Sequence, residues 1–108
     1  MRQNRVQLIG YVGDSPKIKM LDNGTKRATL KVATHYRRRR DNMRSASGTD
    51  WHWVIAWGSD AEFAERSFVR GSHILVEGSI IYREYADYTG SVRKITDIRA
   101  EELINLDR

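Results

Sequence analysis

The tryptophans of this chain lie within one short segment, TDWHWVIAWG, residues 49–58. Trp51, Trp53 and Trp57 all occupy odd positions, and alternate side chains of a β-strand point to opposite faces of the sheet. The segment therefore places three indoles on one face, and His52 with small apolar residues on the other. Such a row is either part of the core or a platform for flat groups. Three inward indoles would overfill a small barrel, so the pattern favours a platform of the kind that stacks on nucleic-acid bases.

Arginines are concentrated just before this segment, in RRRRDNMRSASG. This stretch, residues 37–48, contains one acid and five arginines: Arg37, Arg38, Arg39, Arg40 and Arg44. It is polar and without periodicity, so we expect a mobile loop. A solvated loop or a localisation patch is the alternative, but consecutive guanidinium groups repel one another unless an anion lies between them. Because guanidinium pairs with phosphate in a planar, two-pronged way, the loop predicts phosphate contacts.

A second group of aromatic residues lies near a predicted hairpin tip at residues 86–90. Tyr82, Tyr85 and Tyr88 surround Arg83, an interleaving typical of a second stacking arm. The alternative is that these tyrosines are half-buried on a twisted ribbon, and Tyr82 and Tyr88 fit that structural role as well.

Catalysis and metal binding find little support in the sequence. His35, His52 and His73 fall in three separate strand regions without metal-ligand spacing. The chain has no cysteine, which excludes thiolate chemistry and disulfides. The carboxylates form no paired cluster of the kind that a two-metal nuclease needs. We therefore expect no catalytic residue, no metal and no cofactor.

The composition indicates a globular protein with an anionic partner. Of 108 residues, 40% are hydrophobic and 31% charged, and 19 Lys and Arg against 14 Asp and Glu give a net charge of +5. A basic chain of this kind favours nucleic acid or an anionic membrane surface. No apolar run approaches 18 residues and no basic amphipathic helix is evident, so a membrane role is not expected. Without a secretory signal, we expect a cytoplasmic, nucleoid-associated protein.

The patterning predicts five strands and one helix. Strands are expected at residues 5–13, 27–36, 49–58, 72–85 and 91–103, with a hairpin turn at 22–25. A helix is expected to begin in a capping box formed by Ser59 and Glu62, and Gly78 predicts a bend or a bulge. This order is that of an all-β protein with one short helix: a five-stranded OB-fold Greek-key barrel with the helix between strands 3 and 4. Residues 1–108 are expected to form this single domain.

The combination of motifs resembles the bacterial single-stranded DNA-binding proteins over nearly the whole chain, from Asn4 to about Leu106. The resemblance rests on NRVQLIGYVGDSP, DNGT, LKVAT, TDWHWVIAWG, AEFAE, VRGSHILVEGSI and YREYADYTG. It implies base stacking by Trp51, Trp57 and Tyr85, with Tyr36 the nearest match for a fourth stacking residue. Trp53 joins these as a stacking candidate because it shares the face of the other tryptophans. The resemblance also implies DNA-facing basic residues at Arg5, Arg70 and Arg83. His52 falls at a position that belongs to the subunit interface in this family.

The resemblance implies that the chain binds single-stranded DNA with little sequence preference and protects it in replication, recombination and repair. It further implies a homo-oligomer, a tetramer or in some cases a dimer. The family usually continues into a tail with an acidic tip that recruits other enzymes; this chain stops at Arg108, so we do not expect that recruitment. Two alternatives stay open: an accessory OB protein like primosomal replication protein N, and an OB interaction module whose aromatic face is a subunit interface.

Overall fold

The computed structural model describes residues 3–39 and 45–108, leaving aside the side chains of residues 38, 39, 45 and 46. The strands are β1 (Val6–Val12), β2 (Lys17–Met20), β3 (Lys26–Arg39), β4 (Ser45–Trp57), β5 (His73–Ala86) and β6 (Val92–Asn105). The helix α1 (Ser59–Ser67) lies between β4 and β5.

The strands close into a barrel. Its pairing runs β1–β5–β6–β4–β3, and β3 pairs back to β1 at Tyr11↔Ala33. β2 pairs with the next part of the same edge of β3, so β1 and β2 act as two halves of one interrupted strand. Counted in this way the barrel has five strands, with α1 between the third and fourth. The OB-fold prediction is confirmed, while β2 itself was not predicted because its four residues carry little period-two signal.

The core follows from the alternation along β3 and β4. Leu30 and Val54 face each other across the two strands and are fully buried, as are Ala28 and Ala56. Small and branched residues suit the narrow interior of a five-stranded barrel, where packing is dense.

The helix packs against β3, β4 and β6. It buries Ala61 and Ala64, and Phe68 just after its last turn is also buried. The predicted capping box is wrong: Gly58 is the N-cap residue, and no side chain caps the helix. Instead, the backbone N–H of Gly58 donates to the carbonyl of Lys26, which fixes the start of the helix to β3.

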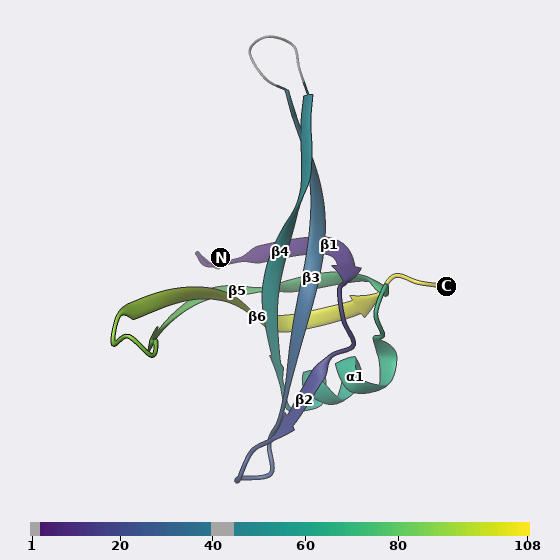
Figure 1. The fold of residues 1–108 in the computed structure, drawn as a ribbon. Coiled ribbons are helices and arrows are strands. Elements are labelled where there is room, and N and C mark those ends of the chain that lie inside the picture. The colour runs from purple at the N-terminus through teal and green to yellow at the C-terminus, as the bar shows by residue number, and fades with distance from the viewer. Residues whose placement is uncertain (1–2, 40–44) are drawn as a thin grey trace.

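Two long hairpins, β3–β4 and β5–β6, extend beyond the barrel (Figure 1). The loop expected at residues 37–48 is wrong in part, because β3 and β4 remain paired as far as Arg39↔Ser45. A two-stranded ribbon that is solvated on both faces needs no alternation of apolar and polar residues. Consecutive charged residues can therefore form a strand here. Arg40 and Arg44 lie outside the described residues.

A change of register in β5 confirms the bulge that was predicted at Gly78. The pairing with β6 shifts between Glu77 and Gly78. A Cβ atom at Gly78 would lie 1.9 Å from the backbone carbonyl oxygen of Arg99. The close approach of β6 therefore requires glycine at this position.

We expect Gly78→Ala to destabilise the barrel by about 3 kcal/mol, because the added methyl group meets backbone rather than a movable side chain. The free energy of unfolding in urea measures the effect. Ser79→Ala, one position along, is the control and should change it by less than about 0.5 kcal/mol. An unchanged unfolding midpoint in the Gly78 variant would contradict the close approach of the two strands.

Candidate nucleic-acid interface

The three tryptophans lie on the outer face of the barrel. The register pairs Arg27 with Trp57, Lys31 with Trp53 and Ala33 with Trp51, so basic side chains of β3 share this face with the indoles. Trp51 is 51% and Trp53 44% exposed, and Trp57 is half-buried. The prediction that the indoles face outward and not into the core is confirmed.

Cations lie against the indoles. The Lys31 Nζ atom is 4.7 Å from the ring centroid of Trp51 and 5.9 Å from that of Trp53. The Arg27 guanidinium carbon is 5.9 Å from the centroid of Trp57. These are cation–π distances. Neither Lys31 nor Arg27 was predicted as a site residue, although the alternation of residues 27–36 places Lys31 on the outer face.

A glycine on the neighbouring strand segment makes room for Trp51. A Cβ atom on Gly13 would lie 2.6 Å from the Cζ3 atom of the Trp51 ring. The Gly13 N–H donates to the carbonyl of Lys31, so this glycine lies beside β3. The indole of Trp51 therefore rests on bare backbone at the junction of β1 and β2.

Tyr85 lies on the β5–β6 hairpin, on the same face of β5 as Arg83. Asp97 on β6 pairs with Ile81 on β5 and with Trp53 on β4. The face of β5 that carries Tyr85 is therefore continuous with the face of the tryptophans. Tyr85 is exposed, as expected for a stacking arm.

Tyr82 and Tyr88 are exposed, so they are not half-buried as the structural alternative expects. Tyr82 points to the opposite face of β5 from Tyr85, because the two are an odd number of residues apart. Tyr88 lies at the hairpin tip and is fully exposed. Neither tyrosine contributes to the barrel core.

The hairpin tip is organised by Asp87. Its carboxylate accepts hydrogen bonds from the backbone N–H groups of Thr89 and Ser91, and it pairs with Arg93. The hydroxyl of Thr89, and next the Arg93 guanidinium, hold the pKa of the Asp87 carboxyl below its ordinary value. These bonds therefore stabilise the tip at neutral pH, and their contribution is lost as the pH falls through the lowered pKa.

Tyr36 does not extend the indole platform. It pairs with Gly48 on the face opposite the tryptophans, and a Cβ atom on Gly48 would lie 2.5 Å from the Tyr36 hydroxyl oxygen. Tyr36, the nearest match for a fourth stacking residue, is therefore separate from the row of indoles. One residue further, Arg37 returns to the face of the tryptophans and is exposed.

The other predicted basic residues lie on three different parts of the fold. Arg38 and Arg39 continue β3. Arg70 is exposed next to Gly71, whose N–H donates to the carbonyl of Val12 beside Gly13. Arg5 lies just before β1 and pairs with Glu77 through Nε and Oε1, 3.0 Å apart.

His52 faces away from the tryptophans, as predicted. Its Nε2 atom lies 2.8 Å from the hydroxyl oxygen of Thr34, in a part-buried position. The histidine is therefore held in place on the opposite surface of the β3–β4 hairpin and does not contribute to the platform.

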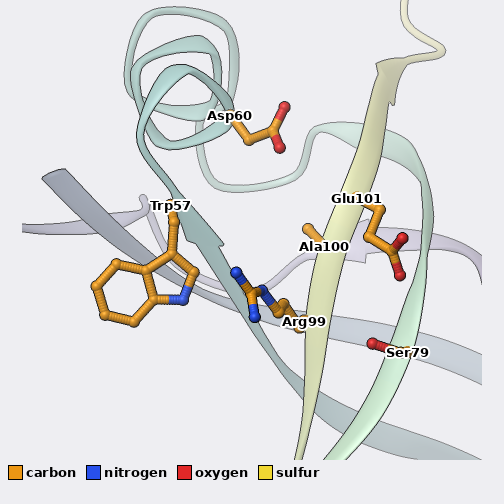
Figure 2. Close-up of a pocket in the computed structure, with 6 residues that line it drawn as sticks. All are labelled: Trp57, Asp60, Ser79, Arg99, Ala100 and Glu101. Atoms are coloured by element: carbon orange, nitrogen blue, oxygen red, sulfur yellow. The ribbon is translucent and has the colours of Figure 1, made fainter. Parts of the chain in front are cut away.

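A groove follows the Trp57 indole. One cavity of about 480 Å³ lies at the start of α1, where the Arg99 guanidinium points toward Trp57 and Asp60 lies at the helix (Figure 2). An adjoining cavity of about 420 Å³ is lined by Ile55, Trp57, Ile81, Arg83, Asp97 and Arg99. A third, of about 290 Å³, extends to Arg27 and Thr29 on β3. We call these three adjoining cavities the Trp57 groove.

Comparison with known proteins assigns the chain to a family. Residues 3–106 match the Single-strand binding protein family. The chain belongs to this family. A single-stranded DNA-binding protein 1 of Xylella fastidiosa is 36% identical over 93% of this chain and 74% of its own length. A single-stranded DNA-binding protein of Bacteroides thetaiotaomicron is 33% identical over 95% of this chain and 65% of its own length.

A solved structure gives the same result. The Plasmodium falciparum SSB in complex with ssDNA has a TM-score of 0.92 and 31% identity, and the match covers 99% of this chain and 97% of that one. The family resemblance and the fold are both confirmed, and membership of the family identifies a binding protein and not an enzyme.

In residues 3–39 and 45–108, no group of three or more His, Asp or Glu side chains is arranged to hold a metal ion. Within the same part of the chain, no helix is long and apolar enough to cross a membrane.

We expect Gly13→Ala to displace the Trp51 ring without unfolding the protein, because the added methyl group meets a side chain that can move. Gly13 does not have a positive φ, so alanine brings no backbone strain. Intrinsic tryptophan fluorescence and its quenching by acrylamide measure the change in exposure. In a Trp51→Phe background the same substitution should leave the fluorescence unaltered; an equal shift in both backgrounds would contradict the contact.

Proposed function

We propose that this protein binds single-stranded DNA with little sequence preference. Bases stack on Trp51, Trp53, Trp57 and Tyr85, and phosphates are met by the arginines around them. The observation that carries this function is the row of exposed indoles, with Lys31 and Arg27 against them, on one face of an OB barrel. Every base has a π-face, so stacking of this kind accepts any sequence.

The basic residues give the electrostatic part of the interaction. Arg37 and Arg83 belong to the platform face. The neighbouring arginines in the sequence, Arg38, Arg39, Arg40 and Arg44, would add to the phosphate contacts. Arg70 and Arg5 would contact the strand where it leaves the platform. Each phosphate neutralised releases counterions, so the slope of log affinity against log salt is about −0.7 per contact.

Family membership and the identity to curated single-stranded DNA-binding proteins favour this function over the two alternatives. A coated strand cannot re-pair or fold into hairpins, and this protects it during replication, recombination and repair. We place the protein in the cytoplasm, at the nucleoid, where such strands arise.

We further propose that the protein is a homo-oligomer. Ile9, Leu75 and Ile104 lie side by side on the outer face of β1, β5 and β6; Ile9 is 54% and Ile104 39% exposed. Beside them, the Tyr11 ring stacks on His73 with centroids 4.7 Å apart. A contiguous apolar patch of this kind is typical of a protein interface, and we assign it to a second copy of the chain.

The surface at His52 is a second candidate contact between copies. It lies on β4, whereas the apolar face is formed by β1, β5 and β6. Closed tetramers with two-fold symmetry use two distinct self-complementary interfaces. The presence of two such surfaces supports a tetramer, whereas a dimer would use one.

Titration with oligo-dT tests DNA binding. We expect strong, saturable quenching of tryptophan fluorescence that weakens as salt is raised. Trp51→Ala and Trp57→Ala should each lower the free energy of binding by about 1–3 kcal/mol. Tyr82→Ala, an exposed aromatic on the other face of β5, is the control and should bind normally. Absence of quenching by the folded protein would contradict the function, and dissociation of subunits in the tryptophan variants would point to an interface instead.

Analytical ultracentrifugation tests the assembly. We expect a mass near four times the 12.5 kDa of one chain. Leu75→Arg should yield dimers, because the charge would be buried on the apolar face, and combination with His52→Glu should yield monomers. Val69→Arg, at an exposed apolar residue outside this face, is the control. An unmodified protein that sediments as a monomer would contradict the proposal.

A further inference from the structure

An exposed arginine, Arg99, lines two of the cavities that form the Trp57 groove. It borders the cavity of about 480 Å³ at the start of α1 and the adjoining cavity of about 420 Å³. Its side chain is exposed, and Figure 2 shows its guanidinium pointing toward the Trp57 indole. A ligand that enters the groove can therefore reach this guanidinium.

The strand pairings place Arg99 between two uncharged neighbours. At this point β6 lies between β4 and β5, and Arg99 pairs with Ile55 on one side and with Ser79 on the other. Neither neighbour can neutralise the guanidinium. The row Ile55–Arg99–Ser79 leads from the indole face across β6 to β5.

The other exposed arginine of the groove already has a partner. The Nε atom of Arg83 is paired with Oδ2 of Asp97, which is 4% exposed, so this pair has no net charge. In the part of the chain that the structure describes, the Arg99 guanidinium has neither an ion pair nor a side-chain hydrogen bond. Arg99 therefore carries the uncompensated positive charge on the β6 side of Trp57.

The two cavities differ in how well they accept an anion. Asp60 and Glu101 line the cavity at the start of α1 and would repel a phosphate there. The carboxylate of the adjoining cavity is already paired with an arginine, and Ile55 and Ile81 give that cavity an apolar lining. An anion bound to Arg99 is therefore favoured on the side of the adjoining cavity, where a base has apolar side chains to lie against.

We propose that Arg99 binds the phosphate of the nucleotide whose base stacks on Trp57. A guanidinium meets a phosphate through two parallel N–H donors, and an arginine without a partner in the free protein loses no contact when it binds one. The strand then crosses from β4 over β6 toward β5 at this residue. The inference rests on the proposed DNA binding and adds the contact that directs the strand away from the row of tryptophans.

The salt dependence of binding to oligo-dT tests this contact. For Arg99→Gln we expect the slope of log affinity against log salt to become shallower by about 0.7, the value for one phosphate of a single strand. The Kd should rise about tenfold, as for the loss of a hydrogen bond between charged groups. Arg99→Lys should keep the slope while Kd still rises, because an ammonium keeps the charge but not the two-pronged contact.

Arg66→Gln is the matched control. It removes the same charge from an exposed arginine on α1 that lines none of the three cavities. Its slope should stay that of the unmodified protein, so a loss of net charge alone is distinguished from a lost phosphate contact. Circular dichroism confirms that each variant is folded.

A double-mutant cycle tests whether the phosphate belongs to the nucleotide on Trp57. If both residues bind one nucleotide, Trp57→Ala combined with Arg99→Gln should raise Kd by less than the product of the two single changes. In a cycle of Arg99→Gln with Trp51→Ala, the changes should multiply, because Trp51 lies six residues from Trp57 along β4, about 20 Å away.

Two results would overturn the proposal and leave DNA binding intact. One is an unchanged salt slope in folded Arg99→Gln, and the other is a simple product in the cycle with Trp57. Failure of the folded, unmodified protein to bind oligo-dT would overturn the proposed function as well.

Discussion

The antiparallel ladder between β3 and β4 is the constraint on which the rest of the structure depends. Because strand side chains alternate with a period of two, its register decides at once what fills the barrel and what covers it. Leu30 and Val54 meet inside, while Lys31 and Trp53 meet outside. A slip of one residue would put indoles into an interior built for alanine and valine. Core stability and the binding surface are therefore two consequences of the same pairing.

The outer surface is not uniform. Toward β1 it is a cation–aromatic surface in which Lys31 lies between Trp51 and Trp53. Toward β6 and β5 it deepens into the Trp57 groove, where charged groups surround a single indole. The first region suits any base, whereas the second contains hydrogen-bonding groups without partners. The two regions of the same sheet thus differ in depth and in the charges around the indoles.

Much of this arrangement could be predicted from the sequence. Apart from β2, the order of strands and helix followed from local patterning, and the change of register at Gly78 followed from glycine. The outward direction of the indoles followed from the narrow interior of a five-stranded barrel, which could not hold them. Tyr36 was named as a stacking residue from the family resemblance, although the alternation of residues 27–36 already places it on the face opposite Lys31. No local signal shows that the β3–β4 pairing continues to Arg39↔Ser45. The same extension places Arg37 on the face of the tryptophans. The N-cap at Gly58 was missed because the backbone bond to Lys26 that fixes the helix start comes from a distant strand.

Asp97 lay beyond sequence reasoning for a related reason. In the sequence it is one acid among several in a β-rich stretch, and its neighbours Trp53 and Ile81 come from strands far away along the chain. Its partner Arg83 was named only as a basic residue. Asp97 and Arg83 lie together in the Trp57 groove because distant strands pair. Residue types alone do not show this.

The placement of Lys31 means that the indole face of the free protein is already occupied. Its ammonium lies over Trp51, and in the proposed complex a base stacked on that ring would take its place. Stacking on Trp51 in the proposed complex would then exchange the Lys31 ammonium for a base. Its contribution to the free energy of binding would be the difference between these two contacts. The indole face of the free protein therefore stays solvated and charged. Such a face can bind DNA without the tendency to aggregate that uncovered aromatic rings would bring.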